Sequence, residues 1–173
     1  MYYAAYGSNL QLHQMKLRCP AAQKIGVSVL PNWQLVFRGV ADIVPAVGHE
    51  VTVGLYSISA ACQAALDHYE SYPTLYRKQA IEVDLGIRSV SAMTYVMNPG
   101  YGYGAPSAEY VDVIRQGYLD WQISYAGLIA SLQQVLDDGG DSAYKSPTWH
   151  LHGAIDRTMG EAIIARLKSN VNR

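Results

Sequence analysis

Two short segments of the sequence combine residue types that could do chemistry. The first is Tyr6-Gly7-Ser8-Asn9-Leu10, where a glycine and two small polar residues follow a strand-like run and precede a plausible helix. A turn of this kind presents consecutive backbone N–H groups and the start of a helix dipole, which suit a carboxylate or a developing oxyanion. An ordinary strand-to-helix turn has the same composition, and the local pattern alone favours it. Ser8 is a weaker candidate for a nucleophile, because no G-x-S-x-G pattern surrounds it.

The second segment lies at the end of an expected helix and contains Glu70. This helix must stop by Tyr72, because Pro73 follows. A carboxylate at the negative end of a helix dipole is disfavoured, so its pKa is expected to be raised. Glu70, flanked by Tyr69 and Tyr72, is therefore a candidate general base near neutral pH. A solvated surface glutamate fits the local pattern equally well.

Two other patterns point less strongly to a site. Residues 100–104 place glycine at alternate positions, but the further glycine of a dinucleotide loop is missing and Pro106 interrupts the approach to a helix. A mobile loop over a pocket, or a plain connector, is the better interpretation. His150 and His152 lack a third ligand at metal-site spacing, which indicates surface or packing roles. The sequence thus predicts neither a metal site nor a cofactor.

The apolar periodicity predicts one α+β domain around these segments. Strand-like runs lie at residues 2–5, 24–30, 33–38, 51–58, 76–84 and 88–97, and further helical patterns lie at 10–17, 128–136 and 158–167. Ser59 and Ser107 are expected to cap two more helices at their N-termini. Five to seven strands with helices inserted late suggest a small sheet or barrel with the helices to one side.

Length and charge exclude several classes of partner. The chain has 173 residues, enough for one domain with a sizeable core, and a formal charge of -1 from 13 basic and 14 acidic side chains. This balance argues against binding to nucleic acid or to an anionic membrane, and no apolar run reaches the roughly 20 residues needed to cross a bilayer. The start lacks the basic region of a signal peptide, and Cys19 and Cys62 show no metal or redox spacing. A soluble, cytoplasmic protein is expected.

Taken together, the motifs resemble those of the γ-glutamyl cyclotransferase family. The resemblance covers about residues 1–135 and rests, in this order, on Tyr6-Gly7-Ser8-Asn9-Leu10, Val53-Gly54-Leu55-Tyr56, Leu66-Asp67-His68-Tyr69-Glu70-Ser71-Tyr72-Pro73, Tyr76, Tyr95-Val96-Met97 and Pro106-Ser107-Ala108-Glu109-Tyr110. It implies a small mixed β-barrel of about five to seven strands with peripheral α-helices. It also implies conversion of a γ-glutamyl amide to 5-oxoproline and a free amine. Residues 1–140 would form the family domain, and residues 141–173 a C-terminal extension that ends in a helix and packs on it.

The resemblance also implies roles for individual residues. Glu70 matches the catalytic acid/base. Ser71 departs from the glycine that frequently follows the family's catalytic glutamate. The residues expected to bind the substrate are the loop whose backbone grips the glutamyl group, together with phenols around the pocket: Tyr6, Gly7, Ser8, Asn9, Leu10, Tyr76, Tyr95 and Tyr110.

Tyrosine is unusually common in this chain. Fourteen Tyr stand against one Phe, which indicates many phenols that have polar partners. With the resemblance, part of this excess is expected to line the pocket. Phenols would give an apolar wall to the glutamyl methylenes and hydroxyls to the charged ends without adding net charge.

A γ-glutamyl amide needs few groups from the protein. Its own α-amine can reach the γ-carbonyl and close a five-membered ring, so no nucleophile has to be supplied. Glu70 could take a proton from the α-ammonium and return one to the leaving nitrogen, while the backbone of residues 7–10 stabilises the oxyanion or holds the α-carboxylate.

Two alternatives stay open at this point. One is a non-catalytic module that binds a γ-glutamyl or acylated amine ligand, and the other is an amide hydrolase that uses water. The leaving amine is not specified, although residues 98–105 and the C-terminal segment are expected to shape its side of the pocket. The oligomeric state is open as well, a homodimer included.

Overall fold

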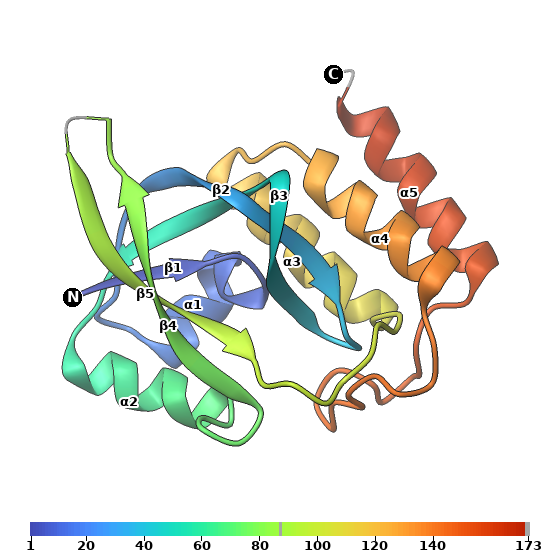
Figure 1. Cartoon of the computed structure of the whole chain (residues 1–173), viewed down its shortest axis with the longest axis horizontal. Coiled ribbons are helices and arrows are strands. Elements are labelled where there is room, and N and C mark those ends of the chain that lie inside the picture. Colours follow the sequence, from blue (N-terminus) through green and yellow to red (C-terminus); the bar gives the residue numbers. More distant parts are fainter. Residues whose placement is uncertain (87, 172–173) are drawn as a thin grey trace.

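The computed structural model describes residues 1–86 and 88–171, so the last two residues of the C-terminal extension lie outside it. Its framework is a mixed five-stranded sheet in the order β2-β3-β1-β5-β4 (Figure 1). The strands are β1 (Tyr2–Ala5), β2 (Gln23–Phe37), β3 (Ala41–Ser57), β4 (Tyr76–Asp84) and β5 (Ser89–Met97). The short β1 lies at the centre, antiparallel to β3 and parallel to β5. The α+β class expected from the sequence is confirmed.

The strand order is open, but the two edges of the sheet touch. On β2, the Ser28 hydroxyl donates to the carbonyl of Asp84, the last residue of β4, over 2.8 Å, and accepts from the Asp84 N–H over 3.2 Å. A side chain therefore joins the edge strands where a closed barrel would have a backbone ladder. The observed strands are at the low end of the expected five to seven, and "barrel" describes them only loosely.

The hairpin of β2 and β3 is longer than predicted. The segments expected as separate strands at 24–30 and 33–38 form one strand, and β3 begins at Ala41 instead of residue 51. Pro31 and Asn32 do not end β2, because the register shifts between Pro31 and Trp33 while Asn32 takes a left-handed backbone conformation with φ of 62°. Pro31 pairs with Glu50 and Trp33 with Pro45, so residues 46–49 of β3 lie opposite Asn32 alone, and the pairing continues beyond this irregularity.

The helices form two groups around this sheet (Figure 1). They are α1 (Leu12–Arg18), α2 (Ala60–Tyr69), α3 (Ala108–Trp121), α4 (Ala126–Asp138) and α5 (Arg157–Val171). Helices α1 and α2 contact each other, whereas α4 packs on β2 and against α5, so the helices do not all lie to one side. No helix in the described ranges is both long and apolar enough to cross a membrane.

The caps of two helices are as predicted, whereas the helix expected at 10–17 starts differently. The hydroxyls of Ser59 and Ser107 accept from backbone N–H groups in the first turns of α2 and α3, each over 3.2 Å. Ser8–Leu10 form a 3₁₀ turn, and Gln11 has an extended backbone that separates this turn from α1. The segment rich in N–H groups is therefore a tight turn and not the start of an α-helix.

Candidate active site

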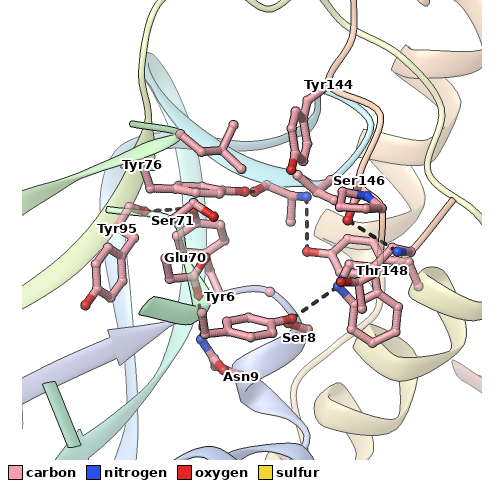
Figure 2. A pocket seen from close by; sticks show the side chains of 18 of the residues that line it. Tyr6, Ser8, Asn9, Glu70, Ser71, Tyr76, Tyr95, Tyr144, Ser146 and Thr148 are labelled. Carbon is pink, nitrogen blue, oxygen red and sulfur yellow. Dashed lines mark hydrogen bonds between the residues drawn. The ribbon is translucent and has the colours of Figure 1, made fainter. Parts of the chain in front are cut away.

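A pocket opens where the turn after β1 meets the C-terminal end of α2 (Figure 2). Its volume is about 120 Å³, below the roughly 300–1,000 Å³ of sites for drug-sized ligands, which suits a molecule of about amino-acid size. We call one side the inner wall, formed by Tyr3, Tyr6–Asn9, Val40, Ala41, Tyr69–Ser71, Leu75, Tyr76, Tyr95 and Tyr110. We call the opposite side the outer wall, formed by Tyr144 and Ser146–Trp149. All the predicted site residues except Leu10 belong to the inner wall.

Leu10 anchors the turn from behind. Its side chain is fully buried, and its carbonyl accepts a 2.7 Å hydrogen bond from the Trp121 indole N–H. A Cβ atom on Gly54 would lie 2.8 Å from the Leu10 side chain, and one on Gly117 would lie 2.6 Å from it. Both glycines therefore allow β3 and α3 to approach Leu10 closely. This leucine fixes the position of the turn instead of lining the pocket.

Glu70 lies directly after α2, with its carboxyl group facing the turn (Figure 2). Its Oε1 accepts a 2.8 Å hydrogen bond from the Asn9 side-chain amide. Burial raises the pKa of Glu70 to about 7, against the lowering effects of the Arg18 charge and the Asn9 hydrogen bond. A raised pKa was predicted, but the cause is burial and not the helix dipole. The carboxyl group can therefore both accept and return a proton near neutral pH.

The backbone after Glu70 accommodates a serine where the family frequently has glycine. Ser71 has a φ of 51°, in the left-handed region that glycine adopts with least strain. The chain then turns back on itself, because the N–H of Tyr72 donates to the carbonyl of Asp67 over 2.9 Å. The geometry that a glycine would favour is thus present in this chain with serine.

The turn from Gly7 to Asn9 offers backbone donors to the pocket. In the ranges that the structure describes, the N–H groups of Ser8 and Asn9 have no protein acceptor, whereas the N–H of Leu10 bonds back to the Gly7 carbonyl over 3.0 Å. A Cβ atom on Gly7 would lie 3.4 Å from the Tyr110 hydroxyl, so this phenol approaches the turn closely. Donors from the turn and from Tyr110 can therefore converge on one anionic group.

The Tyr110 hydroxyl differs from the other predicted phenols in how it is bonded. It accepts from the Ala41 N–H over 3.2 Å, and its own proton has no protein acceptor in the described ranges. By contrast, Tyr6 donates to the carbonyl of Tyr95 over 2.7 Å, and Tyr76 donates to that of Ala41 over 2.6 Å. The hydroxyl of Tyr95 donates to a carboxylate, that of Asp67. Three of the four predicted phenols thus donate their hydroxyl protons to other protein groups, and their rings are held in place as part of the inner wall.

The structure also brings in residues that the sequence did not indicate as site residues. Asn9 was predicted for its backbone, but its side chain donates to Glu70 and, over 2.8 Å, to the Tyr3 hydroxyl. Arg18 donates to the Asn9 side-chain oxygen over 2.7 Å. No motif links an arginine on a short helix to a glutamate after another helix, so only the folded chain could reveal this contact.

A match to a known protein family covers the residues of the inner wall. Residues 3–122 match the family described as "Gamma-glutamyl cyclotransferase, AIG2-like". The chain belongs to this family. All the predicted site residues fall within the matched range, whereas the outer wall lies beyond it.

Solved structures show that the γ-glutamyl cyclotransferase fold extends over nearly the whole chain. A protein named gamma-glutamyl cyclotransferase matches with a TM-score of 0.66 and 21% identity, over 96% of this chain and 98% of its own. The uncharacterized protein loc79017 from Homo sapiens matches with a TM-score of 0.64 and 21% identity, over 95% and 97%. YkqA from Bacillus subtilis matches with a TM-score of 0.64 and 22% identity, over 84% of this chain and 56% of its own. No curated protein matches in sequence.

Beyond the range of the family match, the outer wall closes the pocket through aromatic contacts. The Trp149 indole N–H donates to the Tyr69 hydroxyl over 3.1 Å, and its ring centroid lies 5.1 Å from that of Tyr110. Residues 100–104 do not line the pocket, although they were expected to cover it. They support the outer wall instead, because Gly102 donates from its N–H to the carbonyl of Ser142 over 3.2 Å.

The charge of the pocket comes from one side chain. Burial raises the pKa values of the lining phenols Tyr3, Tyr6, Tyr69, Tyr76, Tyr95, Tyr110 and Tyr144, so they are neutral at physiological pH. Glu70 is thus the only lining residue, among those described, that titrates near neutrality. The described residues contain no group of three potential metal ligands, and His150 and His152 bond to Ser146 and Glu109.

Proposed function

We propose that this protein is a γ-glutamyl cyclotransferase, which converts a small γ-glutamyl amide to 5-oxoproline and a free amine. The observation that carries the proposal is the position of Glu70. Its carboxyl group, with a pKa of about 7, lies beside a turn whose Ser8 and Asn9 N–H groups have no acceptor among the described residues, and both line a pocket of amino-acid size. Membership of the family supports the reaction class.

Glu70 serves as the acid/base of the reaction. It takes a proton from the substrate α-ammonium, and the freed amine attacks the γ-carbonyl carbon to form the lactam C–N bond. The protonated Glu70 then gives this proton to the leaving nitrogen as the original amide C–N bond breaks. The regenerated carboxylate takes the second proton from the ring nitrogen, which leaves the neutral lactam, and passes it to the released amine, which departs as an ammonium ion. Because its pKa is close to neutral, both transfers are accessible at the same pH.

The turn and Tyr110 supply the hydrogen-bond donors. The N–H groups of Ser8 and Asn9, with the hydroxyl of Tyr110, bind either the α-carboxylate or the oxyanion that develops on the γ-carbonyl. These donors belong to a turn and to helix α3, which pack against each other, so they need no reorganisation during the reaction. The walls of Tyr6 and Tyr76 are expected to pack along the glutamyl methylenes.

A direct test is to incubate the purified protein with a panel of γ-glutamyl amides and identify the products by mass spectrometry. The panel contains γ-glutamyl-amino acids and γ-glutamylamines, because both have the reacting glutamyl group. Release of 5-oxoproline with equimolar amine is expected from at least one of them. Recovery of glutamate would identify a hydrolase, and thermal stabilisation without turnover would identify a binding module.

A further inference from the structure

Arg18 approaches the site from outside the pocket and contacts it through other residues. One guanidinium nitrogen donates to the Asn9 side-chain oxygen over 2.7 Å and to the Ser8 hydroxyl over 3.3 Å. The second donates to the side-chain oxygen of Gln14 over 2.9 Å. The guanidinium plane also lies over the Tyr69 ring, 3.6 Å from its centroid. Arg18 is therefore fixed on several sides, although it does not line the pocket.

These contacts determine which way the Asn9 amide faces. With its oxygen on Arg18, the amide directs its N–H groups at the Glu70 carboxylate and the Tyr3 hydroxyl. The reversed amide would place N–H donors against the guanidinium donors and an oxygen against the carboxylate, leaving both contacts unsatisfied. An arginine at this position thus selects the orientation in which Asn9 supports ionised Glu70.

Arg18 also provides the positive charge in the surroundings of Glu70. The Glu70 charge raises the pKa of phenols on β1, β4, β5, α2, α3 and the turn after β1, so these neighbours stay neutral and bring no charge to Glu70: Tyr3, Tyr6, Tyr69, Tyr76, Tyr95 and Tyr110. Arg18 lies on α1, and its charge favours the ionised carboxylate against the effect of burial.

We propose that Arg18 is a positioning residue for the active site. It holds the Asn9 amide toward Glu70 and keeps that carboxylate ionised, without touching the substrate. The inference rests on the proposed function, because it assigns to Glu70 the proton transfers of the cyclisation. It extends that function by adding a residue of α1 to the machinery that sets the pH at which the site works.

The test compares Arg18→Gln and Arg18→Lys with Lys16→Gln, a matched control that removes an exposed cation from the same helix. For Arg18→Gln, we expect the acidic limb of kcat/KM for 5-oxoproline release to move up by about one pH unit. Activity at pH 6.5 then falls about tenfold, with a smaller loss at pH 9. Arg18→Lys restores the position of the limb. It keeps a lower kcat/KM at pH 9, because one ammonium group cannot reproduce the guanidinium fork.

A folded Arg18→Gln variant whose limb and turnover match those of Lys16→Gln would overturn the inference. If that variant fails to fold, full kcat/KM of Arg18→Lys at pH 9 contradicts the positioning role. Titration of the Glu70 carboxyl carbon by NMR separates this inference from the proposed function. An upward shift of the midpoint in Arg18→Gln supports it even without turnover, and an unchanged midpoint rejects it.

Discussion

The inner and outer walls of the pocket are held in different ways. Phenols of the inner wall donate to backbone carbonyls of the sheet, as Tyr6 does to Tyr95 and Tyr76 does to Ala41. The outer wall belongs to a loop, held by bonds such as the one from the N–H of Tyr144 to the carbonyl of Arg38 over 3.0 Å. The inner wall lies within the family match, and the outer wall lies beyond it. We infer that the rigid wall performs the common chemistry, and that the loop distinguishes the leaving amines.

The largest expected effect comes from removing the carboxyl group of the inner wall. Glu70→Gln retains an oxygen that can accept from Asn9, but it cannot transfer protons, so kcat should fall by about 10²–10⁴-fold for every leaving amine. The measurement is steady-state release of 5-oxoproline across the amide panel. Glu82→Gln, an exposed glutamate on β4, is the matched control and should keep full activity. A fall in kcat for only some leaving amines would contradict the inference that the inner wall performs the chemistry and the outer wall selects the amine.

A smaller loss is expected when the donor beside the turn is removed. Tyr110→Phe keeps the aromatic ring against Trp149 but deletes the hydroxyl whose proton is free, so kcat should fall by about 10²-fold. Tyr118→Phe, on the same helix and outside the pocket, should leave kcat within about twofold. Equal kinetics for these two variants would show that the Tyr110 hydroxyl does not act on the substrate.

A change in the outer wall should affect selection among substrates more than turnover. Trp149→Phe removes the N–H that bonds to Tyr69, a contact worth about 1 kcal/mol, and should raise KM about fivefold for some leaving amines and less for others. Values of kcat should stay close to those of the unmodified protein. Ratios of kcat/KM between two γ-glutamyl amides measure this directly. A uniform fall in kcat across the panel would contradict the assignment.

The smallest expected effect concerns stability. Burial raises the pKa of Glu70 in the folded protein to about 7, above the ordinary value near 4.5. The folded state therefore binds an extra proton between these pH values, and its stability falls as the pH rises through them. The glutamine of Glu70→Gln stays uncharged at every pH, so this variant does not become less stable as Glu70 would ionise. Its melting temperature should exceed that of the unmodified protein by several degrees at pH 8, with little difference at pH 4. A constant difference at all pH values would show that Glu70 is not buried as described.

The sequence was sufficient to predict most of the inner wall, because its residues lie in short contiguous motifs. Tyr6 to Asn9 lie at a turn and Glu70 at a helix end. At these places local rules predict exposed backbone N–H groups and a carboxylate in an unfavourable position. The motif predicted Leu10 as part of the loop but not the burial of its side chain, because that burial depends on Gly54 and Gly117, which approach it only after folding. The start of α1 was predicted too early, because no local rule distinguishes a 3₁₀ turn from a first helical turn.

The outer wall and Arg18 could not be predicted in the same way. Trp149 reaches Tyr69 across 80 positions of the chain, and no residue pattern indicates such a contact. The spacing of glycines at 100–104 suggested a loop that covers the pocket. In the structure, Gly102 instead packs closely against Ser142 and donates its N–H to the Ser142 carbonyl. Packing between segments far apart in the sequence determines the Trp149 and Gly102 contacts, so the periodicity of hydrophobic residues does not predict them.

The pH dependence of kcat/KM for the unmodified protein is the most direct test of Glu70 as the acid/base, because the proposed proton transfers use a carboxyl group with a pKa of about 7. The assay follows release of 5-oxoproline from one γ-glutamyl amide between pH 4.5 and 9. We expect kcat/KM to fall about tenfold for each pH unit below about pH 7, where Glu70 becomes protonated. An acidic limb near pH 4.5, or activity unchanged from pH 5 to pH 8, would contradict Glu70 as the buried acid/base.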